Sequence, residues 1–289
     1  MLLPLAACAP IPPEDTPEAS VCPTDLAVGE IVVQADFADG TEGVAFPGAW
    51  FMVTVPDGVM AYSEALGWSR FATLPHALGL APAADGVLVA DPGAFDFSGT
   101  DADGRLLSIG WDGVVAVLAE GMPNPNAIVA GPGDTLLVSD DTSRIYAVAD
   151  GGFTTWLDTV PSPNGMAWSP DGTALYVVST FVPDPPLWRV PLVDGVPGTP
   201  EVVTTFPTGA APDGLAVDAE GGVWVALNVA DEVVRVDLAT GAQTARVTGI
   251  TSPASLAFGA ADGFDPCSLY VTELRGDHVW RLATGVEGG

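Results

Sequence analysis

The chain has 289 residues, with 37 acidic side chains against 8 basic ones, and its formal net charge is -29 at pH 7. This balance excludes electrostatic binding to nucleic acid or to an anionic membrane surface, because both would repel the protein. All basic side chains are arginines, so Schiff-base chemistry and a P-loop are excluded as well. The acidity is typical of a protein kept soluble in salty or extracellular surroundings; a specific cationic partner is the alternative.

The first residues predict a targeting segment. "MLLPLAAC" places small residues before Cys8 and resembles a bacterial lipobox, in which the cysteine is lipidated; a chance alanine-rich start is the alternative. We expect residues 1–8 to be the remnant of a lipoprotein-type signal and 9–28, rich in proline and acid, to be a tether. The protein would then be an exported, periplasmic or cell-surface bacterial lipoprotein, attached to the membrane only through its lipid.

Two further cysteines lie at opposite ends of the chain, Cys22 and Cys267. In an exported protein this pair favours a disulfide that joins the two ends of the fold, and two unrelated buried thiols are the alternative. Neither cysteine has the CxxC or CxxH spacing that would indicate a metal site.

Short apolar runs bounded by Gly, Pro and Asp predict an all-β protein. The runs are "GVLVAD", "TLLVSD", "ALYVVST", "GVWVAL" and "SLYVTE". Each follows another apolar strand, and six such openings recur about 35 to 49 residues apart, in the range of propeller blades. They begin at Thr41, His76, Pro125, Pro163, Pro212 and Pro253.

Two more strands after each pair would complete a four-stranded blade. We therefore expect a single six-bladed β-propeller over residues 29–285, with a β-sandwich as the alternative. Glu30–Phe37 precedes the first blade and would supply the outer strand of the last one, which closes the ring and brings Cys22 towards Cys267.

The repeated phrase Pro-polar-Gly stands where inner strands begin, at one mouth of the channel. We expect Pro to set the entering φ, Gly to allow a tight turn, and the residue between them to face the axis. The converging residues would be Glu42, Asn126, Asn164 and Asp213. Their oxygens suit a divalent metal, Ca²⁺ above all; the alternative is that Asn and Asp only cap turns.

The phrases "TEG", "PNGMAWSPDGTALYV" and "APDGLAVDAEGGVWVA" resemble the regucalcin and gluconolactonase family of six-bladed propellers, from about Glu30 to Leu282. The resemblance implies a divalent ion at the channel mouth that polarises an ester, lactone or phosphoester. It implies Glu42, Asn164 and Asp213 as ligands, with Asn126 contacting metal or substrate. Where sugar lactonases of the family carry an Arg and an Asp around the third-blade Asn, this chain has Asn124 and Ala127, which weakens the case for a sugar acid.

The two histidines, His76 and His278, stand far apart without a nucleophile elbow, so a catalytic triad has little support. Asp213 is the candidate to orient or deprotonate the attacking water, and His76 is a possible substitute if it reaches the mouth. A channel-lining hydrogen bond is the other role open to His76.

Two long segments, Pro92–Asp103 and Phe181–Pro186, would stand over the same mouth. Phe95, Phe97 and Phe181 would give the pocket apolar walls, unless these segments are insertions that point away from it. We therefore expect a monomeric, Ca²⁺-dependent hydrolase of small lactones or related esters. The rival is a non-catalytic propeller that binds a ligand or protein and keeps a structural ion.

Overall fold

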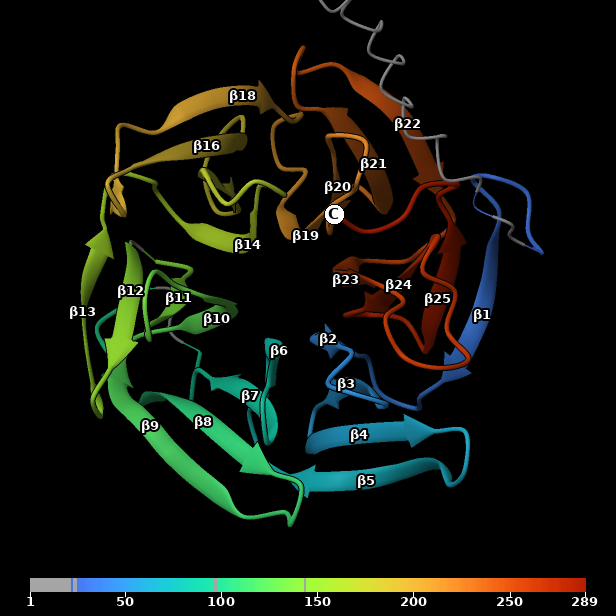
Figure 1. Cartoon of the computed structure of the whole chain (residues 1–289), viewed down its shortest axis with the longest axis horizontal. Helices are drawn as coiled ribbons and strands as arrows, with labels where there is room; N and C mark the ends of the chain where they lie inside the picture. Colours follow the sequence, from blue (N-terminus) through green and yellow to red (C-terminus); the bar gives the residue numbers. More distant parts are fainter. Residues whose placement is uncertain (1–21, 23–24, 96–97, 143) are drawn as a thin grey trace, which may run out of the picture.

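The computed structural model describes residues 22, 25–95, 98–142 and 144–289, and within them the protein is a ring of six antiparallel β-sheets around a central channel (Figure 1). The predicted all-β, six-bladed propeller is confirmed. None of the described segments forms a helix with the length and apolarity that a membrane crossing requires.

Each blade follows the chain outward from an inner strand beside the channel. The first three blades comprise β2 (Val44–Ala45), β3 (Phe51–Val55), β4 (Gly58–Ser63) and β5 (Gly67–Thr73); β6 (Leu80–Ala83), β7 (Gly86–Asp91), β8 (Gly104–Gly110) and β9 (Val115–Met122); and β10 (Pro125–Ala130), β11 (Leu136–Asp140), β12 (Arg144–Ala149) and β13 (Gly152–Leu157). The second inner strand thus begins at Leu80, and His76 lies in the turn before it.

The last three blades follow the same order, and the fourth carries one short extra strand, β17. They comprise β14 (Pro163–Trp168), β15 (Ala174–Ser179), β16 (Pro186–Val193), β17 (Val196–Pro197) and β18 (Glu201–Thr205); β19 (Pro212–Val217), β20 (Gly222–Leu227), β21 (Glu232–Asp237) and β22 (Gln243–Thr248); and β23 (Pro253–Phe258), β24 (Ser268–Glu273), β25 (His278–Ala283) and β1 (Ile31–Asp36).

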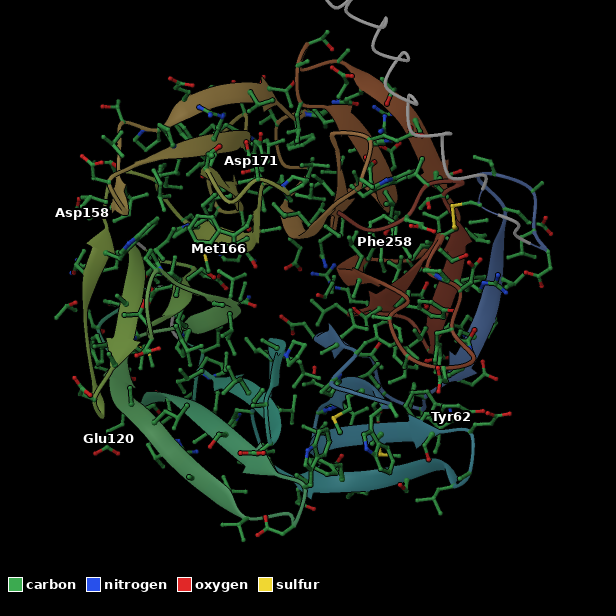
Figure 2. All side chains as sticks on the ribbon, in the orientation of Figure 1. Tyr62, Glu120, Asp158, Met166, Asp171 and Phe258 are labelled. Atoms are coloured by element: carbon green, nitrogen blue, oxygen red, sulfur yellow. A yellow bond between two sulfur atoms is a disulfide. The ribbon has the colours of Figure 1, made fainter. Side chains whose placement is uncertain are left out.

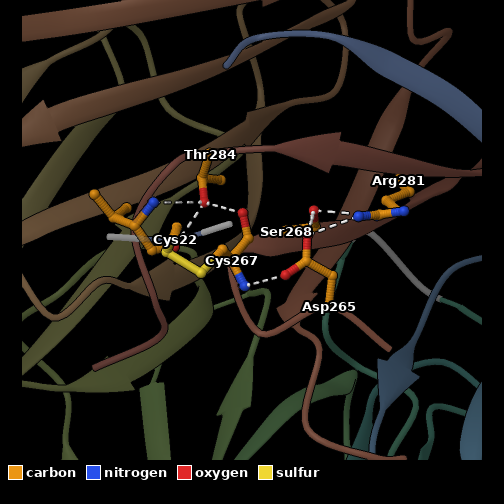
Figure 3. Close-up of a disulfide and its surroundings, with 7 residues drawn as sticks. Cys22, Asp265, Cys267, Ser268, Arg281 and Thr284 are labelled. Carbon is orange, nitrogen blue, oxygen red and sulfur yellow. Dashed lines mark hydrogen bonds and ion pairs between the residues drawn. A yellow bond between two sulfur atoms is a disulfide. The ribbon is translucent and has the colours of Figure 1, made fainter. Parts of the chain in front are cut away.

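The ring closes through its N-terminal strand, as the sequence predicts. β1 pairs antiparallel with β25, so residues from both ends of the chain share the sixth blade. A Cys22–Cys267 disulfide, with Cα atoms 5.7 Å apart, fastens this closure. Around it, Cys267 N donates to Asp265 Oδ1, and Arg281 pairs with Asp265 (Figure 3). Arg281 also pairs with Asp25.

The apolar core consists of six clusters, one at each interface between neighbouring blades. The cluster between the sixth and first blades is rich in aromatic rings, with Phe51, Phe264 and Tyr270 in mutual contact. Charged side chains such as Glu120 and Asp158 lie on the outer rim, whereas Met166 lies towards the channel (Figure 2). The interfaces between neighbouring blades are thus sealed by hydrocarbon.

Candidate functional site

The inner strands of blades three to six begin with a proline at the same end of the channel, which we call the mouth. Pro125, Pro163, Pro212 and Pro253 each pair with the last residue of the second strand of their blade. The residue before the proline has a positive φ in three of these blades, at Ser162, Ala211 and Ser252. It is therefore this residue, and not the glycine that follows, that makes the turn into the strand.

The glycines of the repeated phrase serve a different purpose from the one expected. A Cβ on Gly43, Gly79, Gly165 or Gly214 would lie only 2.0–2.7 Å from a backbone oxygen of the next inner strand. Their φ angles are not positive, so flexibility in a turn does not explain them. Glycine is needed at these four positions because the backbone of the next blade approaches too closely for a side chain, whereas blades three and six carry Ala127 and Ser255 there.

The residues before these glycines, and their counterparts in blades three and six, occupy equivalent positions where the inner strands begin. In ring order these residues are Glu42, Leu78, Asn126, Asn164, Asp213 and Ala254. The four polar ones border both the channel and a cavity of about 360 Å³ above it. The structure therefore brings together Glu42, Asn126, Asn164 and Asp213, the four residues predicted as metal ligands.

Two polar residues at the mouth were missed by sequence reasoning, Asp141 and Asn228. Both come directly after the second strand of a blade, and both line the 360 Å³ cavity. The equivalent residues in blades four and six are Thr180 and Leu274, which line it too. Their fixed position directly after the second strand could have identified them, but the residue type at this position differs from blade to blade.

Hydrogen bonds orient the amides at the mouth. Asn126 Nδ2 donates to Asp141 Oδ2 at 3.1 Å, and the side chain of Asn164 hydrogen-bonds to Asp213. Asn228 Nδ2 also reaches Asp213 Oδ2 at 3.4 Å, while its Oδ1 accepts from Ser252 Oγ. Because the amide N–H groups of Asn126 and Asn164 point to carboxylates, their carbonyl oxygens remain available to a cation.

Three carboxyl groups share this enclosed space, and each has a raised pKa. Burial raises the pKa of Glu42 to about 8, and the charge of Asp141 adds to the effect. Burial, and then the charge of Glu42, raise the pKa of Asp213 well above its ordinary value. Burial also raises the pKa of Asp141, and the charge of Asp213 adds to it. Desolvation and like charges that face one cavity explain all three shifts.

These residues fit a divalent cation. Asp141 is buried, and its Oδ1 accepts no hydrogen bond from any described residue. Glu42 and Asp213 keep partial exposure because they face the cavity. Three carboxylates and two carboxamides form the all-oxygen donor set that Ca²⁺ prefers.

The carboxylates at the mouth surround a space rather than touching one another. Among the described residues, the one trio of Cys, His, Asp or Glu with ligand atoms all within 4.8 Å is Cys22, Cys267 and Glu287. Its sulfurs are joined in the disulfide and do not provide thiolate ligands. At the mouth, the amides of blades three and four come between Glu42 and Asp213 in ring order, so a cation would be shared by several blades.

The aromatic residues expected above the mouth are partly in place. Phe95 and Phe181 line the cavity, and their ring centroids lie 6.4 Å apart in an edge-to-face contact. Phe97 lies outside the described residues, as does Cys8 at the N-terminus. His76 is exposed and borders a neighbouring depression, which Glu42 and Phe95 also border, but not the central cavity itself. His278 lies on β25, where Nδ1 is 2.8 Å from Asp36.

The shared burial of the carboxylates predicts an unusual pH dependence of stability without metal. Folding holds the proton on Glu42 up to about pH 8, whereas the unfolded chain releases it near the ordinary value of 4.5. The folded state then binds more protons between these pH values, so the free energy of unfolding falls as pH rises, by roughly 2–4 kcal/mol. Urea unfolding in EGTA from pH 5 to 9 measures this.

Glu42→Gln is the control, since it should remove the part of this slope that Glu42 contributes. Adding Ca²⁺ to the unaltered protein should also abolish it, because the metal replaces the proton. A stability in EGTA that stays flat or rises with pH, with Glu42 intact, would contradict the shared burial.

Comparisons with known proteins show which family this chain is similar to. Residues 139–275 match the sequence profile described as the SMP-30/Gluconolactonase/LRE-like region. Regucalcin from Xenopus laevis is 29% identical over 136 residues, which span 46% of this chain and 44% of that protein.

Solved structures share the whole ring. A calcium-binding regucalcin from Agrobacterium tumefaciens is 25% identical with a TM-score of 0.67, and the match covers 88% of this chain and 92% of that one. A gluconolactonase from Xanthomonas campestris is 18% identical with a TM-score of 0.70, covering 90% and 89%. The predicted resemblance is thereby confirmed: this chain is similar to the SMP-30/gluconolactonase/LRE-like proteins, most clearly in the stretch that carries Asp141, Asn164 and Asp213.

Proposed function

We propose that the protein is a divalent-metal-dependent hydrolase of lactones or related esters, with Ca²⁺ as the metal. The observation that carries this proposal is that a set of metal-binding side chains and a cavity for a substrate adjoin each other. A ring of three carboxylates and two carboxamides opens directly into a 360 Å³ cavity with a partly apolar lining. A purely structural ion needs no such adjoining cavity, whereas an enzyme needs room for a substrate of this size.

Glu42, Asn126, Asn164, Asp213 and Asp141 would hold the metal, which when bound would act as a Lewis acid on the substrate carbonyl. Asp213 is the group that would orient the attacking water and take its proton, because it faces the cavity and is held by Asn164 and Asn228. Phe95 and Phe181 would exclude bulk water from one side.

The backbone under Glu42 is fixed by hydroxyl groups of the neighbouring strands. Thr272 Oγ1 accepts from Ser255 N and donates to the carbonyl of Glu42. Thr54 Oγ1 accepts from Gly43 N at 2.6 Å and donates to Leu78 O at 2.9 Å. A ligand carried on so constrained a strand supports catalysis because little reorganisation accompanies binding.

A panel of chromogenic esters and lactones, assayed with Ca²⁺ and with excess EDTA, tests the proposal. We expect turnover that EDTA removes and that added Ca²⁺ restores. Tight Ca²⁺ binding by calorimetry without turnover of any member would instead support the non-catalytic rival. Turnover that persists in EDTA would contradict the metal dependence.

A further inference from the structure

We propose that Arg275 is the anion-binding residue of the mouth, and that the substrate is therefore an ester or lactone that carries a carboxylate at the end remote from an apolar body. This inference names the substrate class and so rests on the proposed function. It starts from a positive charge at the mouth that forms no ion pair with any described carboxylate.

Arg275 differs from most other arginines of the chain. Six of the eight form ion pairs with carboxylates, namely Arg70, Arg105, Arg189, Arg235, Arg246 and Arg281. Arg275 forms no ion pair with any residue that the structure describes. In a protein with 37 acidic side chains, a cation without such a partner is notable.

Arg275 is also distinguished by its position: among the residues that the structure describes, it is the one arginine that lines the 360 Å³ cavity. It comes from the β24–β25 loop of the sixth blade. Phe95 and Phe181 come from the second and fourth blades, which flank the third, and their rings are in contact. The third blade lies opposite the sixth in the ring (Figure 1). The cavity thus has an aromatic side and a cationic side, with the ring of carboxylates below.

The loop that carries Arg275 is held in place. Leu274 N donates to Ser252 O at 2.9 Å, which ties the start of the loop to the entrance of β23. The buried carboxylate of Glu273 accepts from Thr251 N at 2.6 Å and from His278 N at 3.2 Å. A Cβ on Gly276 would lie 1.9 Å from Glu273 Oε2, so the loop packs closely against this carboxylate. The guanidinium is therefore presented by a fixed backbone.

This arrangement can bind the carboxylate of a ligand even though the protein as a whole is strongly negative. Once a divalent cation offsets the carboxylates below, the nearest formal charge at the cavity wall is that of Arg275. A guanidinium recognises a carboxylate through two parallel N–H donors. The aromatic pair would at the same time cover the apolar body of the same molecule.

A binding experiment tests the inference without requiring turnover. The probes are 4-phenylbutanoate and its uncharged amide, titrated calorimetrically into the Ca²⁺-loaded protein. We expect the carboxylate to bind about tenfold more tightly than the amide, the size typical of a charge-assisted hydrogen bond. Arg275→Gln should remove this preference and Arg275→Lys should restore part of it. Arg189→Gln, an exposed arginine of β16 paired with Glu201, is the matched control and should keep it.

A preference that survives in Arg275→Gln would overturn the proposal and show that the carboxylate binds the metal instead. A kinetic comparison of two esters then separates the inference from the proposed function. For the charged substrate, the mono-nitrophenyl ester of glutaric acid, Arg275→Gln should weaken apparent substrate binding about tenfold with little change in kcat. For the uncharged substrate, nitrophenyl butyrate, the same variant should change neither kinetic parameter. If neither ester is hydrolysed, the proposed function fails and the calorimetric result alone decides the role of Arg275.

Discussion

Replacing Asp213 by Asn should lower the affinity for Ca²⁺ by about 100-fold or more while leaving the metal-free protein as stable as before, or more stable. The loss follows because a carboxylate between Asn164 and Asn228 is central to the donor set, and changes even behind a metal ligand cost about 10–100-fold in affinity. The gain follows because the substitution removes a buried carboxylate that faces the charge of Glu42 and whose own charge raises the pKa of Asp141. Calorimetry and urea unfolding in EGTA at pH 8 measure the two effects.

A loss of Ca²⁺ affinity without a loss of stability distinguishes a metal ligand from a residue that merely supports the fold. Asp262→Asn provides the matched control, since Asp262 is an exposed carboxylate in the β23–β24 loop, at the other end of the channel. It should change neither quantity. If Asp213→Asn binds Ca²⁺ as tightly as the unaltered protein, the assignment of the mouth as a metal site is wrong.

Removing the disulfide should produce the largest loss of stability, about 3–5 kcal/mol for the double variant Cys22→Ser/Cys267→Ser. The bond joins residues 245 positions apart, so it restricts nearly the whole unfolded chain. It also holds the segment before β1 against the sixth blade, where Arg281 bridges Asp25 and Asp265. Urea unfolding of both proteins measures the difference.

A reductant supplies the control for this prediction. Dithiothreitol should lower the stability of the unaltered protein to that of the double variant, and should leave the double variant unchanged. Equal stability of the two proteins under oxidising conditions would show that β1 and the aromatic interface between the sixth and first blades suffice to close the ring.

The sequence predicts the fold well because the residues that mark the start of an inner strand recur from blade to blade. Prolines at the inner strands and apolar runs after them are local features, and both survive in the structure at Pro163 and Pro212. His76 was misplaced because the second blade has no such proline, so the start of its inner strand is shifted to Leu80.

The site is predicted less completely, since part of it depends on contacts between blades. Asp141 and Asn228 follow second strands and share no common residue type with Thr180 and Leu274, so no repeated letter marks them. The crowding that requires Gly43 and Gly165 involves a carbonyl of the next blade, which no local pattern reveals. Likewise, the missing ion pair of Arg275 becomes visible only when every possible partner has been placed in space.

The disulfide also determines on which face of the propeller the N-terminal segment begins. Cys267 directly precedes β24, which runs towards the mouth and reaches it at Glu273, so Cys22 is fastened to the opposite face of the ring. The N-terminal segment is thus joined to the propeller on the face opposite the cavity. If that segment carries a lipid at Cys8, as we propose from its sequence, the anchored protein would turn its back to the bilayer and hold its cavity open to molecules diffusing in the surrounding medium.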